Sequence, residues 1–176
     1  MNYDSKSETQ VGDGTKAHQL KQHEHWVKWV QEFLTPEEQI GWDYKLLFIT
    51  LTFRNINGEP PSLTFARRAR TKYIEFIREN CFQVIKLFVA EERGKADSNR
   101  LHYHWLMLCR TNVSQRKFKP FGQLADTLKN GWTYGTIKDA KIVENPEGAV
   151  AYVTKYVCKD GGDAVFEDFQ IDGQLV

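Results

Sequence analysis

The chain of 176 residues is 41% hydrophobic and has a formal net charge of +1 at pH 7. This is enough apolar material for one domain with a hydrophobic core. No apolar run approaches the roughly 20 residues of a membrane-spanning helix, which argues against a membrane protein. Three cysteines, Cys81, Cys109 and Cys158, lie far apart without paired spacing, so we expect reduced thiols and a cytoplasmic protein.

Residues 1–17 are polar and rich in turn formers, so we expect them to be disordered. Apolar residues then recur at helical spacing from His18 to Phe33, which predicts an amphipathic helix ending near Pro36. This helix, within residues 18–40, is expected as an appendage to a domain that extends to residue 160. His23 and His25 diverge around such a helix, so we interpret both as surface residues.

The following segments alternate between strand and helix patterns. The strands are short and rich in aromatic and branched residues, whereas the helices show apolar residues at a period of three to four. After the first helix, the expected strands cover residues 44–53, 82–92, 100–108 and 133–143, and the expected helices cover 62–80, 121–128 and 145–159. This order predicts an α+β, ferredoxin-like split β-α-β fold, with a central antiparallel sheet flanked by helices.

Charge is unevenly distributed along the chain. From Asp160 to Val176 there are five acidic residues and no lysine or arginine, which leaves residues 1–159 with a net charge of +6. We therefore expect residues 161–176 to form an acidic C-terminal tail, either a solvated end or a screen for a basic surface until DNA displaces it. The residues expected to contact DNA phosphates are Arg67, Arg68, Arg70, Arg116, Lys117 and Lys119. For any one of them, a solvated surface role is an equal alternative.

Two histidines bracket a tyrosine in the expected strand over residues 100–108. Because side chains alternate along a strand, His102 and His104 point to the same face. Paired neutral imidazoles on one face are suited to metal binding and poorly suited to filling a core.

Two tyrosines four residues apart occur in the last expected helix. Tyr152 and Tyr156 should share one helix face, and Lys155 and Lys159 each follow a tyrosine by three residues. A phenol has a pKa of about 10 and is a weak nucleophile at neutral pH. Nearby ammonium groups favour the phenolate, and a metal ion can neutralise the group being attacked. The pattern therefore indicates catalytic tyrosines assisted by lysines.

Three segments together resemble the HUH endonucleases that initiate rolling-circle replication. These are Phe-Ile-Thr-Leu-Thr-Phe at 48–53, His-Tyr-His at 102–104 and Tyr-Val-Thr-Lys-Tyr at 152–156. The last is similar to the two-tyrosine initiators of small single-stranded DNA phages and some plasmids. The resemblance implies a catalytic domain that nicks single-stranded or extruded origin DNA. The tyrosine becomes linked to the 5′ phosphate and a 3′ hydroxyl is released.

The resemblance also implies a third metal ligand from the strand that precedes the histidines. Glu91 and Glu92 are available there, and strand parity favours Glu92 because Ile85, Leu87 and Val89 occupy the opposite face. A bulge at the strand end would switch the choice to Glu91. Zinc would suit these ligands, but the resemblance favours Mn²⁺ or Mg²⁺. Further implied partners are a helicase and a polymerase supplied by a bacterial or archaeal host cell.

Two alternative functions fit parts of the sequence. A transposase or conjugative relaxase would use the same motifs and the same chemistry. A non-catalytic module that binds single-stranded nucleic acid on a ferredoxin-like sheet would stack bases on Phe48, Tyr103 and Trp105. That second alternative leaves both histidines and the repeated tyrosine-lysine spacing without a role.

Overall fold

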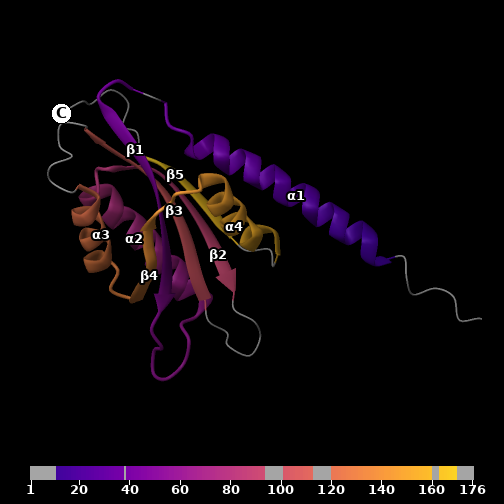
Figure 1. Cartoon of the computed structure of the whole chain (residues 1–176). Coiled ribbons are helices and arrows are strands. Elements are labelled where there is room, and N and C mark those ends of the chain that lie inside the picture. The colour runs from indigo at the N-terminus through magenta and orange to yellow at the C-terminus, as the bar shows by residue number, and fades with distance from the viewer. Residues whose placement is uncertain (1–10, 38, 94–100, 113–119, 160–162, 170–176) are drawn as a thin grey trace, which may run out of the picture.

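The computed structural model describes residues 11–37, 39–93, 101–112, 120–159 and 163–169. Within these ranges the chain folds into five antiparallel strands and four helices (Figure 1). In chain order the elements are α1 (Val11–Leu34), β1 (Trp42–Phe53), α2 (Leu63–Asn80), β2 (Val84–Arg93), β3 (Leu101–Asn112), α3 (Pro120–Gly131), β4 (Gly135–Ile142), α4 (Pro146–Lys159) and β5 (Ala164–Asp168).

The strands lie in the order β4-β1-β3-β2-β5. Each hydrogen-bonded pair is antiparallel, and β3 lies between β1 and β2, which are connected through α2. This is the split β-α-β arrangement. The predicted α+β, ferredoxin-like fold is therefore confirmed.

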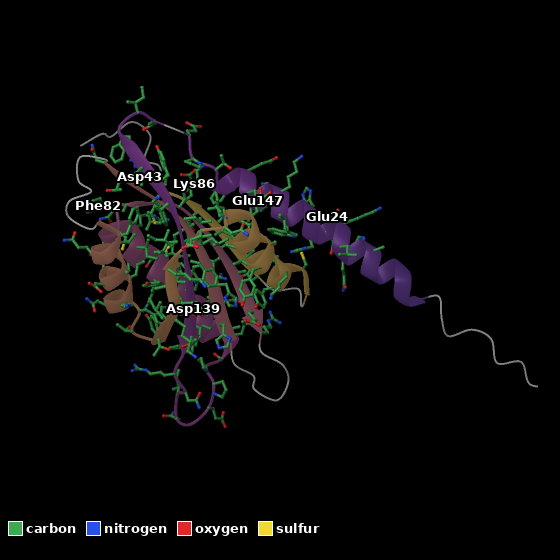
Figure 2. All side chains as sticks on the ribbon, in the orientation of Figure 1. Glu24, Asp43, Phe82, Lys86, Asp139 and Glu147 are labelled. Atoms are coloured by element: carbon green, nitrogen blue, oxygen red, sulfur yellow. The ribbon has the colours of Figure 1, made fainter. Side chains whose placement is uncertain are left out.

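Helices cover both faces of the sheet. One face packs against α2 and α3 through residues such as Ile49, Leu51 and Trp105. The other packs against α4 and α1 through residues such as Phe88 and Leu106. Side chains fill both layers (Figure 2). Since the central strands are buried on both faces, they are nearly continuous apolar runs in the sequence. Polar residues within them are therefore exceptions that need partners.

Both chain-end predictions need correction in the described residues. Helix α1 begins at Val11, within the segment that we expected to be disordered. The expected order also lacked a strand after the last helix, because the segment read as an acidic tail contains β5. This strand pairs with the outer edge of β2, with Val165 opposite Val89.

The acidic residues of this C-terminal segment are paired with arginines of α2. Asp163 Oδ2 lies 2.9 Å from Arg70 Nη1, and Glu167 Oε2 lies 2.9 Å from Arg78 Nη2. The negative charges therefore compensate basic residues of the same domain. They do not belong to a separate solvated tail.

Phe166 of β5 connects the last strand to the first helix. Its ring centroid lies 4.0 Å from that of Trp29 and 5.2 Å from that of Phe33, both on α1. It also lies 4.8 Å from the Phe88 ring of β2. Aromatic contacts of this kind add to the stability gained from burial. None of the helices in the described ranges is long and apolar enough to cross a membrane.

We expect Phe166→Ala to lower the free energy of unfolding by about 2–3 kcal/mol in urea titrations. This is less than the roughly 3–5 kcal/mol for a fully buried phenylalanine, because Phe166 is only partly buried. Phe82→Ala is the matched control, since Phe82 is 81% exposed (Figure 2). It should change stability by less than about 0.5 kcal/mol. Equal losses in both variants would contradict the structural role of β5.

Candidate active site

His102 and His104 lie on the face of β3 that is covered by α4. The register places His104 opposite Ala90 of β2, and His102 opposite Glu92. The carboxylate of Glu92 reaches both imidazoles. Its Oε2 lies 2.7 Å from His104 Nε2 and 3.8 Å from His102 Nδ1. Strand alternation thus brings the two predicted histidines and Glu92 into one cluster, which we name the His-Glu cluster.

Glu91 points to the opposite face of the sheet. Its buried carboxylate accepts two hydrogen bonds from Arg67, at 3.1 and 3.2 Å, and one from Arg93. The Tyr103 hydroxyl lies 3.4 Å from the same carboxylate. No bulge interrupts the pairing of β2 with β3 at this end. The structure therefore places Glu92, rather than Glu91, beside the histidines.

The irregularity in β2 occurs at its start instead. The register shifts between Val84 and Lys86. As a result, Ile85 packs with Phe88 on the α4 side, whereas Leu87 packs on the α2 side. The assignment of Ile85 to the face of Leu87 was wrong because an added residue reverses parity upstream of the bulge. The parity of Glu92 is unaffected.

Thr50 holds His104 from the side opposite Glu92. It lies directly across from His104 in the pairing of β1 with β3, and its Oγ1 is 3.1 Å from His104 Nδ1. Burial lowers the pKa of His104, and the hydrogen bond to Glu92 partly opposes that effect. The imidazole is therefore held neutral and oriented, which is the state that binds metal ions. The sequence motif at 48–53 contains Thr50 but did not reveal this contact.

The donors of the His-Glu cluster suit a divalent cation. Two imidazole nitrogens and a carboxylate oxygen leave coordination positions for water and a phosphate oxygen. Across the described ranges, no three His, Cys, Asp or Glu side chains already form a complete metal cluster. The spread of the contacts to Glu92, from 2.7 to 3.8 Å, accounts for this. Side-chain adjustment by Glu92 and His102 would complete the set.

Tyr152 and Tyr156 project from α4 toward the His-Glu cluster. The ring of Tyr156 stacks on His104 with centroids 4.4 Å apart, and Tyr152 meets His104 edge-on at 5.8 Å. The Tyr156 hydroxyl donates a hydrogen bond of 2.9 Å to the Tyr152 hydroxyl. Tyr152 is 44% exposed, whereas Tyr156 is 9% exposed. The two phenols therefore lie together beside the histidines but differ in their access to solvent.

The environments of the two phenols explain their charge state. Burial raises the pKa of Tyr156, and the hydrogen bond to Tyr152 raises it further. Lys155 Nζ lies 4.0 Å from the centroid of the Tyr152 ring and 4.7 Å from that of Tyr156. One lysine thus contacts both tyrosines, a role that the sequence spacing had divided between two lysines. The side chain of Lys159 lies outside the described residues.

Helix α1 is fixed to α4 next to the tyrosines. His23 Nε2 lies 3.1 Å from the Ala151 carbonyl oxygen and 3.1 Å from Thr154 Oγ1. The expectation that His23 is a plain surface residue was therefore wrong, because its side chain is half-buried against α4. His25 is exposed, as expected.

The predicted phosphate-binding residues are distributed differently. Arg67 and Arg70 belong to α2, on the sheet face away from the tyrosines, and both form ion pairs with Asp163. Arg68 on the same helix is exposed. The remaining three, Arg116, Lys117 and Lys119, lie outside the described residues.

A basic residue that the sequence reading missed lies on the tyrosine side. Lys141 of β4 is positioned over the Phe48 ring, 5.8 Å from its centroid. Lys141 and Phe48, with Asn145 and Tyr152, line part of a cavity of about 700 Å³. Its charge and position give this face of the domain a cation besides Lys155.

The comparison with protein families follows the same core. Residues 46–161, about two thirds of the chain, match the family model of the replication-associated protein ORF2. The chain belongs to this family. The match begins in β1 and includes α4, and it contains the His-Glu cluster and both tyrosines of this replication-associated protein. Helix α1 and strand β5 lie outside it. No curated protein and no solved structure shows significant similarity to the chain.

The two neighbouring glutamates of the replication-associated protein offer a crossed test. We expect Glu92→Gln to weaken Mn²⁺ binding in calorimetry by at least the roughly 10–100-fold seen when an outer-shell partner is lost, with little change in stability. Glu91→Gln should leave Mn²⁺ binding unchanged. It should lower the free energy of unfolding by about 2–3 kcal/mol, because Arg67 and Arg93 lose a buried partner but still reach solvent. The reverse pattern would refute the assignment of Glu92.

Thr50 provides a second test of the metal site. We expect Thr50→Val to reduce Mn²⁺ affinity about tenfold, because His104 loses the hydrogen bond that orients its ring. Thr136→Val is the matched control, since its hydroxyl bonds to Thr52 and not to a histidine. If calorimetry gives equal affinities for both variants, Thr50 does not orient the ligand.

Proposed function

We propose that this replication-associated protein initiates rolling-circle replication by nicking and rejoining single-stranded origin DNA through a 5′-phosphotyrosine intermediate. The observation that carries the proposal is the position of two tyrosine hydroxyls, 2.9 Å apart, next to a histidine that is hydrogen-bonded to Glu92. A nucleophile, a divalent-cation site and a lysine are thereby in contact. These are the components of a metal-assisted phosphoryl transfer.

The proposed reaction exchanges one phosphodiester bond for another. A phenol oxygen attacks the phosphorus, a Tyr–O–P bond forms and the P–O3′ bond breaks. The phenol loses its proton and the departing 3′ oxygen gains one, so the products are a 5′-phosphotyrosine and a free 3′ hydroxyl. Attack by a 3′ hydroxyl on the phosphotyrosine reverses these changes and rejoins the strand.

His102, His104 and Glu92 are the residues that would hold Mn²⁺ or Mg²⁺. Such an ion neutralises charge on the phosphate oxygens and so favours attack. Thr50 keeps one nitrogen of His104 engaged, which leaves Nε2 directed toward Glu92. Lys155, in contact with both rings, favours the phenolate form of whichever tyrosine reacts.

Tyr152 and Tyr156 are proposed to act in turn as nucleophiles. Because their hydroxyls are in hydrogen-bond contact, a phosphate within reach of one is near the other. One tyrosine would hold the 5′ end while the second attacks the regenerated origin after a round of synthesis. The host would supply the helicase that opens the duplex and the polymerase that extends the 3′ hydroxyl.

Burial counts against the alternative of a non-catalytic module that stacks bases on the sheet. Tyr103 and Trp105 are fully buried, and Phe48 is nearly so. Stacking requires an accessible aromatic face. The sheet face under α4 therefore lacks the surface that this alternative needs, whereas Tyr152 remains accessible.

The decisive test combines the protein with Mn²⁺ and a labelled single-stranded oligonucleotide covering the origin of its own replicon. We expect a covalent adduct on a denaturing gel for wild type, and a reduced single-turnover yield for Tyr152→Phe and for Tyr156→Phe. The double variant should form none, because no phenol remains to carry the phosphate.

Tyr44→Phe is the matched control, since the Tyr44 hydroxyl donates to a backbone carbonyl far along the chain from α4. It should behave as wild type. If one active-site variant abolishes the adduct and the other has no effect, the enzyme uses a single tyrosine. If wild type binds the strand without forming an adduct, the protein is a binding module.

A further inference from the structure

A hollow lies between α1 and α4 at the edge of the candidate active site. It has a volume of about 620 Å³ and is walled on one side by Gln19, Leu20 and His23 of α1. The other lining residues are Glu92, Lys155, Tyr156 and Cys158. Two of these, Glu92 and Tyr156, belong to the groups proposed to act on the scissile phosphate. The hollow is thus continuous with that site.

The α1 wall is built from this chain's own additions to the family core. Helix α1 ends before the first residue matched by the family model. His23 holds the helix in place through Ala151 and Thr154, one turn or less from the tyrosines. Gln19 and His23 are four residues apart and so share a helix face. The wall is therefore fixed relative to the nucleophiles.

The lining combines the three chemistries that a nucleotide requires. The amide of Gln19 can both donate to and accept from the edge of a base. Leu20 is 61% exposed, an apolar side chain that a base could cover. Lys155 provides a positive charge for the phosphate that links the base to the reacting position. A strand held at Tyr156 would bring its neighbouring nucleotide to this hollow.

We propose that the hollow binds one base of the single-stranded DNA next to the scissile phosphate, and that Gln19 and Leu20 of α1 help to determine which sequence is nicked. This proposal deepens the proposed function and rests on it for the identity of the strand. It assigns α1 a direct role in recognition, beyond its packing on α4.

The test is a coupling measurement on the full chain without divalent metal, so that no nicking occurs. The probe is a 5′-fluorescein oligonucleotide covering the origin strand, and a set in which each base in turn is replaced by an abasic residue. Binding is followed by fluorescence anisotropy. In wild type, we expect one abasic position beside the nick to raise Kd about tenfold, within the range for loss of a protein-bound base.

The Gln19→Ala/Leu20→Ala variant should bind the intact strand about tenfold more weakly. It should show no further loss at that one abasic position, because base and wall contribute to the same contact. Gln31→Ala/Ile40→Ala is the matched control. These residues lie outside the lining and should keep the full abasic effect. Circular dichroism confirms that each variant is folded.

Two outcomes would overturn the proposal: an α1 variant that binds as the control does, or losses at every abasic position that add to those of the variant. Adduct formation by wild type with Mn²⁺ is measured separately. An adduct together with uncoupled α1 variants refutes the α1 subsite alone. Coupling without an adduct supports base binding in the hollow while refuting the nicking reaction.

Discussion

The register of three adjacent strands is the constraint on which the candidate active site depends. Thr50 of β1 lies opposite His104 of β3, and His102 lies opposite Glu92 of β2. This row crosses the sheet on the face covered by α4. A shift of one residue in either pairing would turn its members to the other face, among the apolar contacts of α2. The buried strands fix the register, so the fold also fixes the polar row.

The sheet separates two groups of charged residues that adjoin in sequence. On one face Glu92 serves the histidines, while on the other Glu91 neutralises Arg67 and Arg93. Strong ion pairing raises the pKa of Arg67, so this group stays charged. Helix α2 is consequently basic in sequence but largely compensated in three dimensions. Accessible positive charge near the tyrosines comes from Lys155 and Lys141.

Local patterns were sufficient to predict the strands, the ferredoxin-like order and the shared face of the two histidines. The choice of Glu92 over Glu91 also follows from alternation alone. What could not be predicted depends on tertiary contacts. The bond from Thr50 requires the register, and the position of His23 requires the packing of α1 on α4. Strand β5 was missed because its acidic residues suggest solvent until their arginine partners are known.

The stacked position of Tyr156 has a kinetic consequence. Its ring lies flat against His104 and is mostly buried, so its oxygen has no space for a bulky substituent in this rotamer. Helix α4 is held by His23 from α1, and Asp163 beyond its end is held by Arg70. The backbone is thus poorly placed to move. In a mechanism with alternating nucleophiles, exchange between them would be a side-chain rotation that separates an aromatic stack, and that step could limit the rate of turnover.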